Sequence, residues 1–225
     1  MIEAIDITKS YANGGGVVKA LDSASLKVDE AEFIMIVGRS GSGKSTLLSV
    51  LGGLTRPTSG NVNMDGKNIW KMSDQELSRV RAREIGFVFQ FSGLLPTLNA
   101  VENVMLPSMF SNNKSEASKR AVDLLESLGI GNKADSYPSQ LSGGELKRVA
   151  IARSLINGPK YILADEPTGD LDVDTERDIM DLFKRINQTG KTIVLVTHNP
   201  DLSPYATRLL RMDKGRIGDW KPHDG

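Results

Sequence analysis

The sequence predicts an α/β fold with a mainly parallel core sheet, an antiparallel β part at the N-terminus and an inserted helical part. Three observations support this prediction. Short apolar runs that do not alternate recur along the chain, as is typical of strands buried on both faces of a sheet. The first thirty residues and residues 60–70 alternate instead, which favours antiparallel strands. Residues 91–158 contain no convincing strand.

The apolar runs share one further feature, which is a polar group at the C-terminal end. The runs are "FIMIVG" (33–38), "IGFVFQ" (85–90), "YILADE" (161–166) and "TIVLVTH" (192–198). The first leads into a glycine-rich loop, and the others end on Gln90, on Asp165 and Glu166, and on Thr197 and His198. Ligands of open parallel α/β sheets bind at this edge, so we expect these groups to meet there.

The remaining elements are recognised by their ends. Asp65-Gly66 is a turn signal between two short strands. Ser73 and Glu76 have the spacing of a capping box, and Gly129 and Gly190 follow helical patterns at positions typical of helix ends. The predicted helices cover residues 45–54, 73–84, 115–129 and 174–190.

Composition excludes several classes of function. The 225 residues include 28 Lys and Arg and 28 Asp and Glu, so no basic surface indicates a nucleic-acid partner. The chain has no cysteine, which excludes disulfides, cysteine metal sites and thiol catalysis and fits a reducing cytosol. No signal peptide or membrane span is evident, so we expect any membrane role to come through another chain.

Residues 38–46, "GRSGSGKST", fit the phosphate-loop pattern G-x-x-x-x-G-K-[ST] between a strand and a helix. The glycines let backbone N–H groups converge on phosphate oxygens, Lys44 reaches the β and γ phosphates, and the Ser45 hydroxyl can bind Mg²⁺. The following helix presents its positive end to the same anion. The predicted ATP-binding residues here are Gly38, Arg39, Ser40, Gly41, Ser42, Gly43, Lys44, Ser45 and Thr46.

Asp165 and Glu166 are adjacent carboxylates at a strand end, and burying both without compensation is costly. Asp165 is predicted to hold Mg²⁺ through water, and Glu166 is the candidate general base for an attacking water. Gln90 and His198 lie at the same predicted edge. Their own patterns leave a structural role equally open.

A second glycine-rich turn, "LSGGELKR" at residues 141–148, precedes an apolar-periodic helix. A capping box explains Ser142 and Glu145 but not Gly143 and Gly144, because each glycine inside a helix costs about 1 kcal/mol relative to alanine. Glycines there allow close approach of a ligand or another backbone. The chain thus has two anion-facing helix starts and one Gly-Lys-Ser, so the second start is interpreted as binding the nucleotide of another copy.

The order of phosphate loop, Gln90, "LSGGE", "YILADE", "GDLD" and His198 resembles the ATP-binding subunit of ABC transporters over essentially the whole chain. The resemblance implies an ABC ATPase fold in a single domain over 1–225. Residues 1–90 and 159–225 would form a RecA-like core with the antiparallel part, and 91–158 the helical subdomain. It also implies hydrolysis of ATP with Mg²⁺ in a head-to-tail dimer of two copies.

The same resemblance assigns roles to single residues. Gln90 is similar to the Q-loop residue that touches Mg²⁺ and senses a permease, and Glu166 to the catalytic carboxylate. His198 resembles the residue that contacts the γ-phosphate, alongside the catalytic Lys44. The remaining assignments are Tyr11 stacking on adenine, Ser142, Gly143, Gly144 and Glu145 as the signature loop acting across the dimer, and Asp172 in the D-loop.

Within the family, "LADEPTGDLD", "GGLTRPTSG" and "VENVMLP" resemble the lipoprotein-releasing and macrolide-exporter branch, which also resembles the cell-division ATPase. Two features depart from that pattern. Asp170 stands where the branch usually has Asn, and "SGGELKR" stands where many members have glutamines after the glycines. Neither departure removes a catalytic group.

The implied partner is an integral-membrane permease, contacted near Gln90 and the segment 91–104 with its apolar Leu94, Leu95 and Leu98. The ATPase would then be cytoplasmic and peripheral on the cytoplasmic face of the cell membrane. The alternatives are a soluble or cell-division-type ABC ATPase that powers a non-transport complex, a P-loop kinase, and an adaptor with an inactive site. The intact Lys44 and Glu166 disfavour the last, and no acceptor site or lid supports a kinase.

Overall fold

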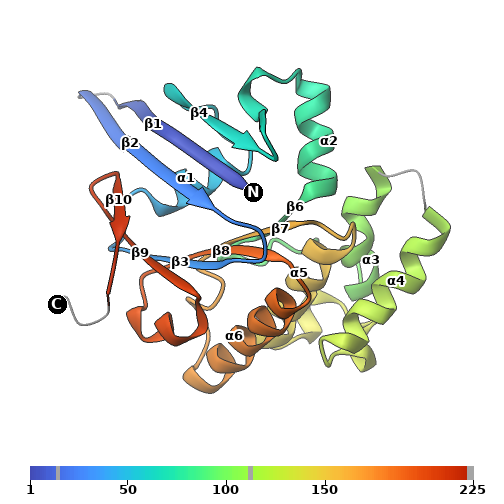
Figure 1. Ribbon diagram of the computed structural model, residues 1–225. Coiled ribbons are helices and arrows are strands. Elements are labelled where there is room, and N and C mark those ends of the chain that lie inside the picture. Colours follow the sequence, from blue (N-terminus) through green and yellow to red (C-terminus); the bar gives the residue numbers. More distant parts are fainter. Residues whose placement is uncertain (14–15, 111–113, 222–225) are drawn as a thin grey trace.

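The computed structural model describes residues 1–13, 16–110 and 114–221, and it contains two sheets and a set of helices (Figure 1). The strands are β1 (Ile2–Asn13), β2 (Gly16–Val28), β3 (Phe33–Val37), β4 (Ser59–Met64), β5 (Lys67–Asn68), β6 (Ile85–Val88), β7 (Tyr161–Asp165), β8 (Thr192–Thr197), β9 (Arg208–Asp213) and β10 (Arg216–Asp219). The α-helices are α1 (Lys44–Leu51), α2 (Asp74–Glu84), α3 (Ala100–Met105), α4 (Lys114–Ser127), α5 (Gly143–Leu155) and α6 (Val173–Gln188). Short 3₁₀ turns cover Ile69–Lys71, Leu106–Phe110, Gly131–Lys133, Pro138–Gln140 and Pro200–Tyr205.

The core sheet has the strand order β10-β9-β3-β8-β7-β6. Neighbouring strands from β9 to β6 pair in parallel, and only β10 runs antiparallel to its neighbour β9. The four apolar runs form β3, β6, β7 and β8, so the predicted parallel core is confirmed. The β9–β10 hairpin was not predicted, because its residues mix buried and exposed positions and its turn is Lys214-Gly215 rather than Asn-Gly or Asp-Gly.

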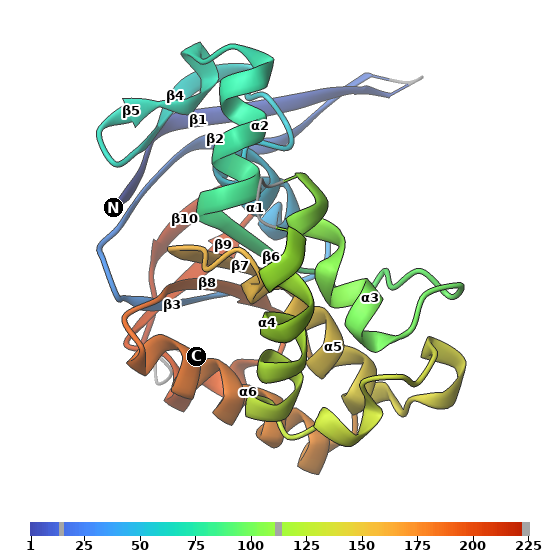
Figure 2. The same ribbon diagram turned by 90° about the vertical axis from the view of Figure 1, so that its right-hand side faces the viewer.

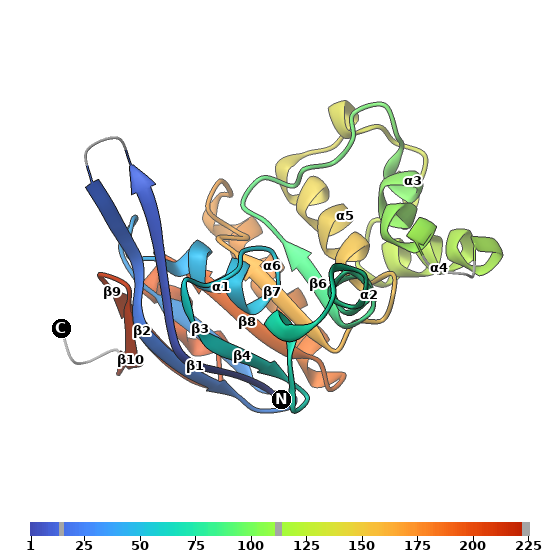
Figure 3. The same ribbon diagram turned by 90° about the horizontal axis from the view of Figure 1, so that it is seen from above.

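The second sheet is antiparallel with the order β2-β1-β4-β5, as the alternating N-terminal sequence predicts. It packs over one face of the core sheet, with α1 between the two sheets (Figures 1 and 3). One apolar cluster fills this space and includes Ile2, Leu47, Ile34 and Val196.

Helices cover the opposite face of the core sheet. The second apolar cluster joins Phe33 and Met35 of β3 to Phe183 of α6 and Ile151 of α5. Residues of β3 therefore alternate between the two clusters, which is why the whole strand is apolar. Between β6 and β7 the described residues form only helices and loops, and α3 and α4 stand beside the sheet in Figure 1 and on the side that faces the viewer in Figure 2.

Most predicted helix ends agree with the structure. Ser73 and Glu76 form both hydrogen bonds of a capping box at α2, and Gly129 and Gly190 adopt positive φ values of 76° and 87° after α4 and α6. Of the three leucines named for the expected permease contact, Leu95 is exposed, whereas Leu94 and Leu98 are half-buried and Leu94 packs on the second cluster. Of the helices within 1–13, 16–110 and 114–221, none is long and apolar enough to cross a membrane.

Candidate nucleotide-binding site

The phosphate loop connects β3 to α1, so it lies at the carboxyl edge of the core sheet. Gly41 and Gly43 have φ values of 78° and 109°, which favour glycine. A side chain on Gly43 would also collide with the Ala20 carbonyl oxygen of β2. No side chain caps the N-terminus of α1, so its first N–H groups remain available to an anion.

Lys44 is folded into this loop and is only 6% exposed. Its Nζ donates to the carbonyl oxygens of Gly38 at 2.7 Å and Arg39 at 3.2 Å. The Ser42 hydroxyl is buried without a partner in the described part of the chain. An orphaned buried hydroxyl is costly, and a phosphate oxygen would satisfy it together with Lys44, so the residues fit a nucleotide phosphate.

Asp165 ends β7, and its Oδ1 accepts a 3.0 Å hydrogen bond from the Ser45 hydroxyl. Burial raises the pKa of Asp165, although the hydrogen bond from Ser45 counteracts part of the shift. A carboxylate and a hydroxyl are hard oxygen ligands of the kind Mg²⁺ prefers, so this pair fits that ion. No group of three or more His, Asp or Glu residues suited to a metal occurs among the described residues.

Three predicted catalytic residues meet at Glu166. Its Oε1 lies 3.3 Å from Lys44 Nζ, and its Oε2 lies 2.8 Å from His198 Nδ1 and accepts a 3.1 Å bond from the His198 backbone N–H. Glu166 has a φ of 46°, which is strained for a non-glycine residue. Backbone bonds from Glu166 N to Val196 O and from Gly169 N to Glu166 O hold this conformation.

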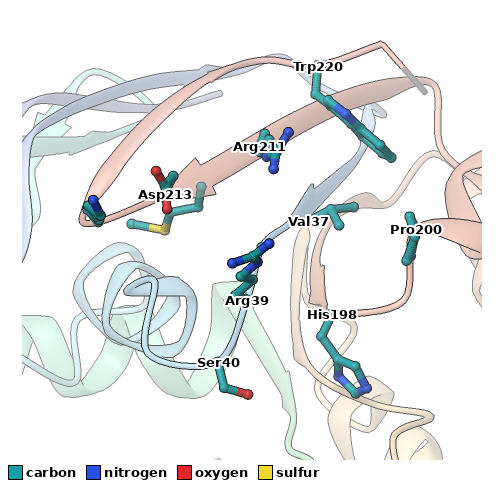
Figure 4. A pocket seen from close by; sticks show the side chains of 11 residues that line it. Val37, Arg39, Ser40, His198, Pro200, Arg211, Asp213 and Trp220 are labelled. Atoms are coloured by element: carbon teal, nitrogen blue, oxygen red, sulfur yellow. The ribbon is translucent and has the colours of Figure 1, made fainter. Parts of the chain in front are cut away.

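The other predicted nucleotide contacts lie around the same loop. Arg39 and Ser40 line a cavity of about 710 Å³ with His198, Arg211 and Trp220, as Figure 4 shows. The sequence analysis missed the last two, because they belong to the unpredicted hairpin and the segment after it. Thr46 is half-buried in the first turn of α1.

In the part of the chain that the structure describes, no hydrogen bond or ion pair joins the side chain of Tyr11 or of Gln90 to the phosphate loop. Tyr11 is 42% exposed in β1, where it pairs with Val18, two residues before the Ala20 that touches Gly43. Gln90 lies two residues beyond the end of β6, and its Nε2 is 3.5 Å from where a Cβ on Gly169 would be. No hydrogen bond among the described residues joins its side chain to Ser45 or Asp165, so its metal role stays a prediction.

The signature residues form the predicted start of α5. Ser142 Oγ accepts from Glu145 N at 3.3 Å, and Glu145 Oε2 accepts from Ser142 N at 2.8 Å. Intrachain packing explains part of the glycine pair, because a Cβ on Gly144 would lie 2.6 Å from Thr175 Cγ2 of α6. Within the described ranges, no hydrogen bond or ion pair joins Ser142–Glu145 to residues 38–46.

The D-loop leads into α6, where Asp172 is the N-cap. Asp172 accepts from the Thr175 backbone N–H at 3.0 Å and from its hydroxyl at 2.6 Å. Glu176, which sequence reasoning missed, accepts from Thr168 at 2.7 Å and Asn199 at 3.1 Å. It thereby ties the segment after Glu166 to the segment after His198.

A phosphate loop at the end of β3, a Ser45–Asp165 pair and a carboxylate beside them define a P-loop nucleoside triphosphatase. The family model described as "ABC transporter" matches residues 21–169, more than half of the chain. The chain belongs to this family and is an ATP-binding cassette subunit with ATPase activity.

Similar proteins agree with this assignment. The chain is 46% identical to the lipoprotein-releasing system ATP-binding protein LolD of Bdellovibrio bacteriovorus, over 98% of this chain and 100% of that protein. It is 44% identical to the macrolide export ATP-binding/permease protein MacB of Chlorobaculum tepidum, over 97% of this chain but 34% of the longer protein. The dimeric post-hydrolysis structure of the cassette MJ0796 with ADP and Pi superposes with a TM-score of 0.89 at 40% identity, covering 98% and 99% of the two chains.

Proposed function

We propose that two copies of this chain pair head to tail around two ATP molecules. Each site would combine the phosphate loop of one copy with Ser142–Glu145 of the other. The observation that carries the proposal is that Ser142 and Gly143 are exposed, while no hydrogen bond or ion pair among the described residues joins their loop to the phosphate loop of the same chain. The similar cassette MJ0796 is dimeric and is bound to ADP and Pi, which supports a pair of copies that binds nucleotide.

In this assignment, the loop from Gly38 to Thr46 binds the phosphates, Tyr11 stacks on adenine, and Asp172 lies at the dimer contact. Ser45 and Asp165, with Gln90, would hold Mg²⁺, which neutralises charge on the phosphates. A γ-phosphate would draw Lys44 away from Glu166. The freed Oε1 can then accept a proton from the attacking water, while His198 contacts the γ-phosphate.

We further infer that the chain acts as one domain whose helical part, 91–158, meets an integral-membrane permease. A groove of about 500 Å³ supports this inference, because it is lined by Leu54, Phe87, Phe89 and Pro107 from both parts of the chain. LolD is named as part of a lipoprotein-releasing system, and MacB joins a similar segment to a permease. The cassette would then lie on the cytoplasmic face of the membrane.

The shared site is tested with two inactive variants, Lys44→Ala and Gly143→Asp. The first removes the cation of the phosphate loop. The second places a carboxylate where the γ-phosphate should lie, so like charges repel. The Gly143 Cβ position is 3.3 Å from the movable Leu171 Cδ2, so we expect Gly143→Asp to fold, and thermal melting checks this.

In a mixed dimer of the two variants, one site collects both lesions and the other is intact. ATP-dependent pairing of the two differently tagged chains should therefore recover on mixing, with Glu166→Gln added to both to slow turnover. If each chain used its own signature loop, every site would carry one lesion. No better pairing in the mixture than in either variant alone, while Glu166→Gln chains pair normally, would refute the shared site.

A further inference from the structure

Helix α5 directs two cationic side chains at the segment Phe89–Gly93, which follows β6. Lys147 Nζ donates to the carbonyl oxygen of Phe89 at 3.2 Å and also to that of Gln90. Arg153 donates to the carbonyl oxygens of Ser92 at 2.5 Å and Gly93 at 2.8 Å. Two side chains six positions apart on one helix therefore bind four of the five carbonyl groups in this segment.

Lys147 is only 4% exposed, which is unusual for a lysine side chain. Neither Lys147 nor Arg153 has an ion-pair partner within 4.0 Å in the described part of the chain. Burial lowers the pKa of both side chains, and the Asp170 carboxylate counteracts part of the shift at Lys147. An apolar side chain would fill the space around Lys147 without the cost of burying a charge. What a lysine adds at this position is therefore its hydrogen bonds to the Gln90 segment.

The position of Lys147 connects three loops of the proposed machinery. It lies four residues after Gly143, about one helical turn from the signature loop. Gln90, Gly143, Lys147 and Asp170 line one small cavity of about 270 Å³. Lys147 also stands in "SGGELKR", and Asp170 in "GDLD", the two places where this chain departs from the pattern of its branch.

We propose that Lys147 is a positioning residue that fixes the backbone of Gln90 to the first turns of α5, with Asp170 as its counter-charge. In the proposed dimer, Gln90 lies at one ATP site and Ser142–Glu145 of the same chain lies at the other. A movement of Gln90 would then also move this signature loop. Arg153 extends the attachment to Ser92 and Gly93. This inference depends on the proposed head-to-tail dimer for its consequence, but the attachment itself exists in the single chain.

The attachment is tested first without nucleotide. Phe91 is 76% exposed and lies inside the attached segment, and the chain has no native cysteine. A nitroxide on Phe91→Cys should be more mobile by electron paramagnetic resonance in Lys147→Met than in the parent, and Lys147→Arg should restore the parent spectrum. Arg148→Met is the matched control, because Arg148 bonds to Leu128 O and not to the Gln90 segment. An unchanged spectrum in Lys147→Met refutes the attachment.

The consequence is tested in a Glu166→Gln background by ATP-driven pairing. Lys147→Met should weaken pairing about tenfold or more, because it removes both charged hydrogen bonds from Lys147 to the Gln90 segment, while ATP binding to the single chain stays within about twofold. Lys147→Arg should recover most of the loss, and Arg148→Met should not reproduce it. Equal pairing in Lys147→Met and parent, or an equal loss in Arg148→Met, refutes the positioning role.

Two other results, an unstable Lys147→Met variant and a Glu166→Gln parent that does not pair, also have a clear interpretation. If Lys147→Met melts too early to assay, Lys147→Gln, which keeps an uncharged NH₂ group as a donor on a shorter side chain, is measured in both experiments with the same expected direction. If the Glu166→Gln parent does not pair with ATP, the shared-site dimer is wrong, and the nitroxide experiment alone decides whether Lys147 holds the segment.

Discussion

Glu166 is contacted by Lys44 on one oxygen and by His198 on the other, so its carboxylate has a fixed place before any nucleotide binds. Glu166→Gln keeps the shape of the side chain, but an amide cannot accept the proton of a water nucleophile. We expect ATP turnover to fall about 10²- to 10⁴-fold, measured by phosphate release, while ATP-bound dimers persist in size-exclusion chromatography. Turnover at the parent rate would move the base elsewhere, and His198→Ala would then be the next variant to assay.

Lys44 is the buried cation of the phosphate loop, and its Nζ already bonds two loop carbonyl groups. Lys44→Ala should weaken ATP binding about 10- to 100-fold, because a hydrogen bond to a charged group contributes about 1.5–3 kcal/mol. Titration with a fluorescent ATP analogue measures the loss. Lys71→Ala, at an exposed lysine outside the site, should bind like the parent, and normal binding by Lys44→Ala would contradict the phosphate-loop assignment.

At the scale of the elements, α5 approaches α6 closely at Gly144. Alanine favours a helix over glycine by about 1 kcal/mol, but its Cβ would lie 2.6 Å from Thr175 Cγ2, and overpacking of this kind costs about 1–3 kcal/mol. We therefore expect Gly144→Ala to lower the free energy of unfolding by about 1 kcal/mol in urea denaturation.

The matched variant is Gly144→Ala with Thr175→Ser. Serine removes the methyl group and keeps the hydroxyl that bonds Asp172 at 2.6 Å. This pair of substitutions should recover the parent stability or exceed it. If Gly144→Ala alone is as stable as the parent, close packing is not the reason for the second glycine of the signature.

The antiparallel sheet is tied to the core sheet by a charged contact at Asp65, in the turn before β5. Burial alone would raise the pKa of Asp65. Hydrogen bonds from the amino terminus, Tyr161 and Lys160 outweigh this effect and hold the pKa of Asp65 well below its usual range. Tyr161 Oη and Lys160 Nζ lie 2.6 Å and 2.9 Å from Asp65 Oδ1. A depressed folded-state pKa means that this stabilisation is complete above the unfolded pKa of about 4 and is lost as the pH falls below it.

Asp65→Asn tests this contact, since asparagine also tolerates the φ of 49° at this turn. At pH 7 the variant should lose about 0.5–1 kcal/mol of unfolding free energy, a modest value because Asp65 is half-exposed. The difference from the parent should shrink between about pH 4 and pH 2. A difference that does not change with pH would show that the Asp65 charge is not responsible.

The sequence predicts the elements whose signals are local. Apolar runs locate β3, β6, β7 and β8, and capping boxes locate the starts of α2 and α5. It does not predict β9 and β10, because their burial depends on neighbours far along the chain. For the same reason, Lys147 resembles any helix-surface lysine in the sequence, and only tertiary packing buries it. The convergence of Lys44, Glu166 and His198 is predicted because three strand ends meet at one sheet edge.

At the scale of the whole molecule, the proposed membrane partner needs a surface that joins the core sheet to the helical part. The groove lined by Leu54, Phe87, Phe89 and Pro107 has this position. Two rings of its wall pack on each other, since Phe87 and Phe89 stack at a centroid distance of 5.6 Å with an interplanar angle of 2°. Phe89 is nevertheless 43% exposed, which is typical of an aromatic anchor that a partner covers.

Single cysteines at Phe89, which lines the groove, and at Phe91, two residues further along the attached segment, should therefore cross-link to an integral-membrane protein in intact membranes, because both side chains are exposed. Asp29→Cys is the control, as an exposed residue at the end of β2 that does not line the groove. We expect a cross-linked band from the two phenylalanine positions, identified by mass spectrometry, and none from Asp29. Capture from Asp29 but from neither phenylalanine would place the permease on another face of the chain. The segment that Lys147 holds would then lie away from the permease contact.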